Sequence, residues 1–186
     1  IDVETSLLGV FNVENVLGAV AAALLLDVDD DAIAEGVRAV TGVPGRFELV
    51  SRPGDDITVI VDYAHTPDAL EKALQALRVH CKGQLWCLVG CGGDRDRGKR
   101  AEMGLQASAV ADVVVITDDN PRSEDPAVIR EAIRAGAEQG TSTVHVIAGR
   151  REAIEHAWGL ARPGDVIALR EGVTFVPAVG FASSTV

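Results

Sequence analysis

The sequence is poor in aromatic residues and cysteine, and it has no long apolar run. Aromatic residues make up 4% of the 186 residues, and there are three cysteines. Cys81, Cys87 and Cys91 are odd in number and lack the C-x-x-C spacing of zinc or redox sites, so we expect reduced structural thiols. The most apolar stretch, residues 16–26, is too short to cross a bilayer and lacks the basic flank of a signal peptide. We therefore expect a cytoplasmic protein without a membrane segment.

Positive charge is also scarce, because 28 acidic residues face 17 basic ones and the net charge is -11. Phosphate backbones and anionic lipid surfaces repel such a chain, which argues against nucleic-acid binding and general membrane binding. Apolar residues nevertheless make up 47%, which is normal for a packed core. The length allows one ordinary domain and part of another.

Residues 1–44 do not have the pattern of a complete domain. Apolar residues recur at helical spacing between Phe11 and Leu25, and a second helix is predicted at about 30–40, after an acidic cluster that suits a helix N-terminus. Residues 1–9 are typical of the end of a strand. Two helices that have no sheet to pack against would leave one apolar face uncovered. We therefore interpret residues 1–44 as the end of an upstream domain and a Gly- and Pro-rich hinge.

Residues 45–169 alternate between strand and helix patterns. Strands are predicted at 47–51, 57–61, 85–89, 113–117, 143–147 and 166–169. Helices are predicted at 67–79, 98–110, 126–138 and 150–160. This alternation is typical of a doubly wound α/β domain with a mostly parallel sheet. Residues 170–186 follow as an atypical tail.

Three polar segments each follow a predicted strand. The first polar segment is DYAHTP (62–67), the second is GCGGDRDRGKR (90–100) and the third is DDNPR (118–122). Because parallel strands end at the same edge of a sheet, the three should meet where α/β sheets bind ligands. In the third, two carboxylates, an amide and a guanidinium suit a ligand with both an ammonium and a carboxylate. The alternative is that Asp119 pairs with Arg122 and Asn120 caps a turn.

The second polar segment fits the start of a phosphate-binding P-loop, G-x-x-x-x-G-K. Arg100 stands where magnesium coordination needs a Ser or Thr hydroxyl, so we reject a P-loop. A basic cluster at a helix N-terminus suits an anion site, and the alternative is a solvated charge run. This cluster is Arg95, Arg97, Lys99 and Arg100. In the first polar segment, Asp62 and His65 suit a nucleotide, and the alternative is a strand-end cap and a helix-entry residue.

DYAHTPDAL, GCGGDRDRGKR and DDNPRSEDP, in this order and spacing, resemble the C-terminal domain of the Mur ligase family. The resemblance is to the members that add 2,6-diaminopimelate to a UDP-linked muramoyl dipeptide in peptidoglycan synthesis. FNVENVLGAVAA and GVPGRFE resemble the end of that family's central ATPase domain and its hinge. The resemblance implies an amide-forming ligase: ATP phosphorylates the side-chain carboxylate of D-glutamate, and an amine of diaminopimelate attacks the acyl phosphate.

The resemblance also implies roles for individual positions, although it assigns no catalytic residue. The positions that match the family's diaminopimelate site are Arg95, Asp119, Asn120, Pro121 and Arg122. The positions that match ATP-facing residues are Asn12, Asn15, Arg46, Asp62, His65 and Lys99, of which Lys99 is the weaker phosphate candidate. ATP is the implied co-substrate, and Mg²⁺ is the implied metal, with most of its ligands in an upstream domain.

The sequence departs from the family in two ways. The family's uridine-binding domain, its P-loop and its carbamylated, magnesium-holding lysine have no counterpart here. Where the family continues with a GKGHE-type loop, this chain reads LREGVTFVPAVGFASSTV. We therefore expect an incomplete ligase that is inactive alone. We also expect it to be a monomer. The alternative is a non-catalytic module that binds an amino acid.

Overall fold

Short runs of β-branched and aliphatic residues form one six-stranded sheet in the computed structural model, which describes residues 1–52 and 54–170. The strands are β1 (Glu48–Leu49), β2 (Thr58–Asp62), β3 (Leu85–Val89), β4 (Val113–Ile116), β5 (Thr143–Val146) and β6 (Val166–Arg170). Their order across the sheet is β1-β2-β6-β3-β4-β5. Only β1 and β2 pair antiparallel, and the other neighbours are parallel. The prediction of a mostly parallel sheet is confirmed.

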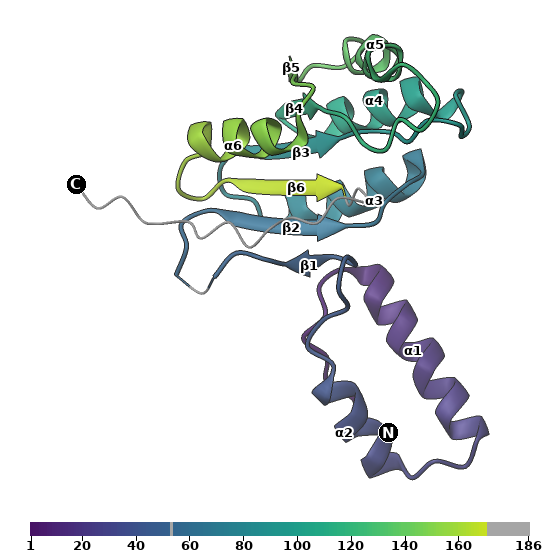
Figure 1. The fold of residues 1–186 in the computed structure, drawn as a ribbon. Coiled ribbons are helices and arrows are strands. Elements are labelled where there is room, and N and C mark those ends of the chain that lie inside the picture. Colours follow the sequence, from purple (N-terminus) through teal and green to yellow (C-terminus); the bar gives the residue numbers. More distant parts are fainter. Residues whose placement is uncertain (53, 171–186) are drawn as a thin grey trace.

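Helices cover both faces of this sheet (Figure 1). The described helices are α1 (Val10–Leu25), α2 (Asp30–Ala39), α3 (Pro67–Arg78), α4 (Lys99–Val110), α5 (Pro126–Ala137) and α6 (Arg150–Leu160). Helices α3, α4 and α5 pack on one face and α6 on the other, which makes the fold doubly wound. Thr66 caps α3 and Asp125 caps α5, each followed by a proline in the first turn.

The central strands are buried on both faces because their side chains alternate between two cores. In β3, Leu85, Cys87 and Val89 belong to the core under α3, α4 and α5. Trp86 and Leu88 belong to the core under α6. All three cysteines are free, and burial raises the pKa of the Cys87 thiol to about 12. This agrees with the expectation of structural thiols.

Helices α1 and α2 lie beside the α/β body, beyond β1 (Figure 1). The ring of Phe11 in α1 meets the ring of Phe47 edge-on, with 5.2 Å between centroids. Much of α1 is exposed, including Val10 (75%) and Leu25 (85%), so the expected leftover apolar face is present. Described helices include none that is long and apolar enough to span a membrane.

Two sequence predictions in the N-terminal part are corrected. Residues 1–9 form no strand: the N-terminus lies beside α2 (Figure 1), and Glu4 pairs with Arg38 of that helix at 3.7 Å. Strand β1 is shorter than predicted, since Phe47 adopts a left-handed φ of 49° and cannot continue the extended backbone. The other predicted bounds lie within one residue of the observed ones. The predicted tail lies outside the described residues, apart from Arg170.

Helices α4 and α5 approach each other through two glycines. A Cβ added to Gly104 would lie 2.0 Å from the carbonyl oxygen of Ile133. A Cβ added to Gly136 would lie 1.8 Å from the carbonyl oxygen of Ala101. Both contacts are with backbone, which has no rotamer to change. These helices carry the second and third polar segments at their N-terminal ends, so their separation fixes the distance between those segments.

We predict that Gly104→Ala lowers the free energy of unfolding by about 1–3 kcal/mol, because overpacking outweighs the gain in helix propensity. Gly159 in α6 is the matched control, since an added Cβ there meets no described atom within 4 Å. Gly159→Ala should leave stability unchanged or raise it by up to ~1 kcal/mol. Urea unfolding followed by circular dichroism measures both. Equal stability of the two variants would contradict the close contact between α4 and α5.

The outer edge of the sheet contains a pair of histidines. His145 on β5 and His156 on α6 have ring centroids 4.8 Å apart. Burial, and secondarily the charge of His156, lowers the pKa of His145. Protonation of His145 therefore favours the unfolded chain, where the pKa is near its ordinary value of about 6.5.

We predict that this contribution to stability is fully present above about pH 6.5 and is lost as pH falls toward the lower pKa of folded His145. His145→Gln should reduce the loss of unfolding free energy between pH 7.5 and 5.5, which urea titrations at both values would measure. The control is His80→Gln, because His80 is exposed and has no ring partner among the described residues. If both variants retain the wild-type loss, the histidine pair contributes nothing to it.

Candidate functional site

The three polar segments meet at one edge of the sheet, as the parallel topology predicts. Arg170, at the end of β6, joins them. Its Nε donates to the carbonyl oxygen of Ala64 in the first segment (3.0 Å). Its Nη1 donates to the carbonyl oxygen of Gly90 in the second (2.7 Å) and to Asp119 Oδ2 in the third (2.7 Å). Sequence reasoning missed Arg170, whose position at a strand end was the only available signal.

Asp119 is held by this contact with Arg170 and not by Arg122. Its side chain is 8% exposed, and its Oδ1 accepts from the backbone N–H of Asn120 at 2.8 Å. Burial opposes ionisation, but the hydrogen bond and ion pair with Arg170 outweigh it and hold the pKa of Asp119 below its ordinary value. The alternative of an Asp119–Arg122 pair is wrong, because the Arg122 guanidinium donates to the carbonyl oxygen of Gly93 (2.7 Å).

The rest of the third polar segment forms a tight turn against the second. Asn120 Oδ1 accepts from the backbone N–H of Arg122 at 3.2 Å, so Asn120 does cap a turn. The carbonyl oxygen of Asn120 accepts from the N–H of Gly93 at 2.8 Å. A Cβ on Gly93 would lie 1.9 Å from the carbonyl oxygen of Pro121, so only glycine fits there. The Arg122 side chain is thereby placed beside the second segment.

The basic cluster of the second polar segment divides into three roles. Arg100 is 2% exposed and pairs with Glu124 at 2.8 Å, so it is a structural cation and not an anion ligand. Arg97 pairs with the same carboxylate at 3.2 Å. Lys99 Nζ donates to the carbonyl oxygen of His65 at 2.9 Å. Arg95 is exposed and has no hydrogen-bond or ion-pair partner among the described residues.

The first polar segment faces the hinge. Asp62 accepts from the backbone N–H groups of Phe47 and Ala64, both at 2.8 Å, and therefore acts as a strand-end cap. The Arg46 guanidinium lies 4.5 Å from the centroid of the Tyr63 ring. The Tyr63 and His65 rings are 5.2 Å apart. The hinge and the first segment thus share one exposed cluster that carries positive charge.

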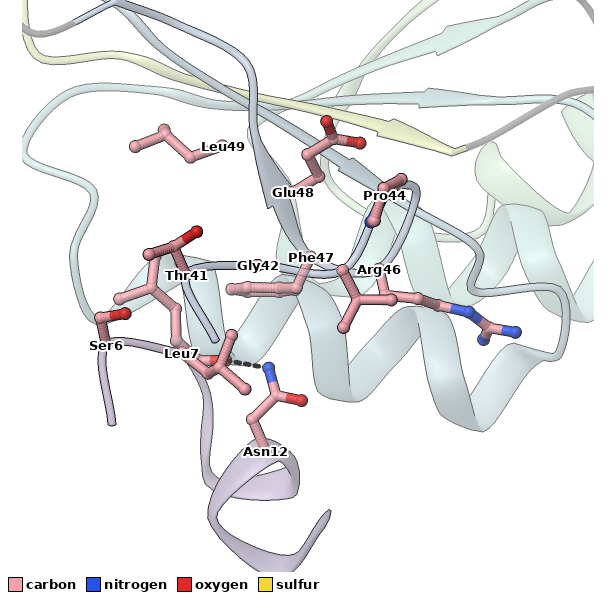
Figure 2. Close-up of a pocket in the computed structure, with 12 residues that line it drawn as sticks. Ser6, Leu7, Asn12, Thr41, Gly42, Pro44, Arg46, Phe47, Glu48 and Leu49 are labelled. Atoms are coloured by element: carbon pink, nitrogen blue, oxygen red, sulfur yellow. Dashed lines mark hydrogen bonds between the residues drawn. The ribbon is translucent and has the colours of Figure 1, made fainter. Parts of the chain in front are cut away.

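A pocket of about 530 Å³ lies between the hinge and the start of α1 (Figure 2). Its lining residues are Ser6, Leu7, Leu8, Asn12, Thr41, Gly42, Val43, Pro44, Arg46, Phe47, Glu48 and Leu49. Figure 2 shows the Arg46 side chain extending away from the other labelled residues, and Asn12 turned toward the chain segment before α1, where its Nδ2 donates to the carbonyl oxygen of Leu8 (2.7 Å). This volume lies within the range of small-molecule pockets.

Asn15 does not line the hinge pocket. It hydrogen-bonds Asn12 at 3.2 Å and borders a separate apolar pocket of about 420 Å³ between α1 and α2. The described residues contain no cluster of three or more His, Cys, Asp or Glu side chains that could hold a metal. The two oxygens of Asp62 already accept backbone hydrogen bonds. The described residues therefore offer no such cluster for the implied Mg²⁺.

Residues 45–170 match the family model described as Mur ligase, glutamate ligase domain. The chain is 52% identical over 163 residues to the UDP-N-acetylmuramoyl-L-alanyl-D-glutamate–2,6-diaminopimelate ligase of Vibrio vulnificus (strain YJ016), which covers 88% of this chain and 33% of that protein.

Solved structures agree. A structure of a UDP-N-acetylmuramoyl-L-alanyl-D-glutamate–2,6-diaminopimelate ligase has a TM-score of 0.66 and 43% identity, over 90% of this chain and 34% of that one. The UDP-N-acetylmuramate-alanine ligase of Thermotoga maritima has a TM-score of 0.70 at 20% identity, over 94% and 37%, and shows the fold alone.

The chain thus spans about a third of the length of the ligases that it matches. Within that third, the family model covers the whole α/β body, from the hinge to the last strand, including all three polar segments. This chain belongs to the Mur ligase family, and residues 45–170 match its glutamate ligase domain.

Proposed function

We propose that this chain is part of an ATP-dependent ligase that adds meso-2,6-diaminopimelate to UDP-N-acetylmuramoyl-L-alanyl-D-glutamate. The observation that carries the proposal is the meeting of all three polar segments at one sheet edge, in a chain 52% identical to a ligase of that name. The division into residues 1–44 (end of the ATPase domain and hinge) and 45–169 (C-terminal domain) is part of the proposal. So are a cytoplasmic location and a monomeric state.

The proposed amino-acid site consists of Arg95, Asp119, Asn120, Pro121 and Arg122. Arg95 and Arg122 are exposed residues on adjoining loops, and their guanidiniums suit the two carboxylates of diaminopimelate, because a guanidinium binds a carboxylate through two parallel hydrogen bonds. Asp119 and Asn120 already accept hydrogen bonds within the turn, and Asp119 also accepts one from Arg170 at the end of β6. We assign them the orientation of the turn, and Asp119 also supplies negative charge for an ammonium group.

The proposed ATP site runs from the hinge pocket to the first polar segment. Asn12 and Arg46 line the pocket, which has room for a nucleotide base. Arg46, His65 and Lys99 are linked through Tyr63 and the His65 carbonyl, and the positive charges of Arg46 and Lys99 suit phosphates. Asn15 supports Asn12, and Asp62 fixes the backbone of Phe47.

ATP supplies the activation in this reaction, and the described residues contribute binding and orientation. A folylpolyglutamate synthase from Yersinia pestis with this fold was solved with AMPPNP and a manganese ion. Because no described cluster here can hold a metal alone, we propose that the Mg²⁺ ligands come mostly from other parts of the ligase. The site at the sheet edge would hold diaminopimelate by its carboxylates, so that one amine is directed at the activated D-glutamate.

A non-catalytic module that binds an amino acid is the alternative function. It is favoured by one observation: the described residues contain groups suited to a zwitterion but no metal cluster. The two functions differ in what happens when the remaining parts of a ligase are supplied.

We predict that this chain completes a ligase in mixture. It would be combined with a protein carrying the first two domains of the Vibrio vulnificus ligase, together with ATP, Mg²⁺ and the muramoyl dipeptide. Phosphate release and tripeptide formation should require both proteins and diaminopimelate. Ligation by this chain alone would contradict its incompleteness, and binding of diaminopimelate without turnover in the mixture would favour the binding module.

We predict that Arg122→Lys in the same mixture lowers the ratio of kcat/KM for diaminopimelate to that for lysine by at least about tenfold. Lysine lacks the second carboxylate, and a hydrogen bond to a charged group contributes about 1.5–3 kcal/mol. Competition kinetics at fixed ATP measure the ratio. Arg134→Lys on α5 is the control, because the ion pairs of Arg134 with described residues are with Glu131 and Glu138, its neighbours along the chain. An unchanged ratio for Arg122→Lys would transfer the selective role to Arg95.

A further inference from the structure

Glu124 joins the two loops that carry the proposed amino-acid site. These are the β3–α4 loop (residues 90–98) and the β4–α5 loop (residues 117–125). Glu124 Oε1 accepts from the backbone N–H of Asp94 at 2.6 Å and from Arg100 Nη2 at 2.8 Å. Its Oε2 accepts from Arg100 Nη1 at 3.1 Å. One carboxylate in the second loop therefore holds both the backbone of the first loop and the start of α4.

Asp94 returns the contact from the first loop to the second. Its Oδ2 accepts from the backbone N–H of Ser123 at 3.1 Å, and its Oδ1 accepts from the Ser123 hydroxyl at 2.7 Å. These hydrogen bonds hold the pKa of Asp94 below its ordinary value. The Arg122 guanidinium adds a third link through the carbonyl oxygen of Gly93. Each loop thus fixes the other through neighbouring residues.

Both loops contain a strained residue that needs such support. Asp94 has a φ of 52° and Arg122 a φ of 49°, the left-handed region that non-glycine residues adopt at a cost. Asp94 directly precedes Arg95, and Arg122 directly precedes Ser123. The backbone strain therefore lies at Arg122 and directly before Arg95, the two arginines that are proposed to bind the carboxylates of diaminopimelate.

The anchor of this arrangement is buried and stays charged. Arg100 is 2% exposed, and the Glu124 side chain is 10% exposed. The hydrogen bonds from Arg100, and secondarily from the Asp94 N–H, lower the pKa of Glu124 to about 2. Glu124 is thus ionised at any physiological pH. Removing its charge would leave Arg100 buried without a counter-ion, which is strongly unfavourable.

We propose that Glu124 and Arg100 are positioning residues that set the relative placement of Arg95 and Arg122, and through it the preference for a dicarboxylic over a monocarboxylic diamino acid. This rests on the proposed function for the identity of the ligand. Both side chains are largely buried, so in this proposal they act through the two loops and not by contact with the ligand. A bidentate grip on two carboxylates requires both guanidiniums at fixed separation, whereas a ligand with one carboxylate does not use that separation.

The test compares Glu124→Gln with Glu131→Gln, the same change at an exposed ion pair on α5. The first readout is amide hydrogen exchange of the 186-residue chain without ligand. Glu124→Gln should accelerate exchange at residues 93–98 and 119–125 by about tenfold or more, while Glu131→Gln should leave these loops unchanged. Unaltered exchange in Glu124→Gln would overturn the inference, whatever the chain binds.

The second readout is the ratio of kcat/KM for diaminopimelate to that for lysine in the two-protein mixture. Glu124→Gln should lower this ratio about tenfold or more, while kcat/KM for lysine changes much less. Accelerated exchange with an unchanged ratio would also overturn the inference, because the pair would then be structural only. If the wild-type chain neither binds nor uses diaminopimelate, the proposed function fails separately, and the exchange result still judges the loops.

Ser123→Ala is the second variant, in case Glu124→Gln does not fold. It removes only the hydroxyl bond to Asp94 and keeps the buried ion pair. Exchange at 93–98 and 119–125 and the substrate ratio should shift in the same direction by a smaller factor. A folded Ser123→Ala chain with wild-type exchange and ratio would count against the inference.

Discussion

The site depends on a close backbone contact between two loops that only glycine permits. A Cβ on Gly90 would lie 2.6 Å from the carbonyl oxygen of Thr117, and one on Gly93 would lie 1.9 Å from that of Pro121. These gaps are smaller than van der Waals contact, so any side chain would separate the loops. Without the contact, the hydrogen bonds of Glu124 and Asp94 between the loops could not form, and the guanidiniums beside them would lose their fixed placement.

Much of the fold could be predicted from the sequence because its signals are local. A β-branched run such as 113–116 defines a buried strand, and a proline after a capping residue defines the start of α3 and α5. The meeting of the polar segments followed from parallel topology. The hydrogen-bond partners of individual side chains could not be predicted in this way. Arg170 contacts Asp119 across 51 residues of sequence, and Arg100 contacts Glu124 across 24. Contacts at such separations produce no periodic pattern in the sequence.

Carboxylates have different hydrogen-bond partners at the two ends of the parallel strands. At the edge where the parallel strands begin, Asp165 accepts from the backbone N–H of Gln84 and from Trp86 Nε1, and Asp112 accepts from the N–H of Leu85. These hydrogen bonds join the starts of neighbouring strands to one another. At the opposite edge, where the strands end, Asp119 and Glu124 also accept from arginines, but exposed Arg95 and Arg122 lie beside them. When a carboxylate and a guanidinium both lie at a strand end, the sequence therefore does not predict whether they form an ion pair with each other or are available to a ligand.

Phe47 carries three neighbours at once: its ring meets Phe11 of α1, its N–H is held by Asp62, and it follows Arg46, which stacks on Tyr63. Phe47 therefore connects α1 to the hinge and to the first polar segment, and α1 could rotate about this contact as a rigid helix. Such a rotation of α1 would change the shape of the hinge pocket and would also tilt the Arg46 guanidinium over the Tyr63 ring. The shape of the hinge pocket and the position of the Arg46 guanidinium would then change together.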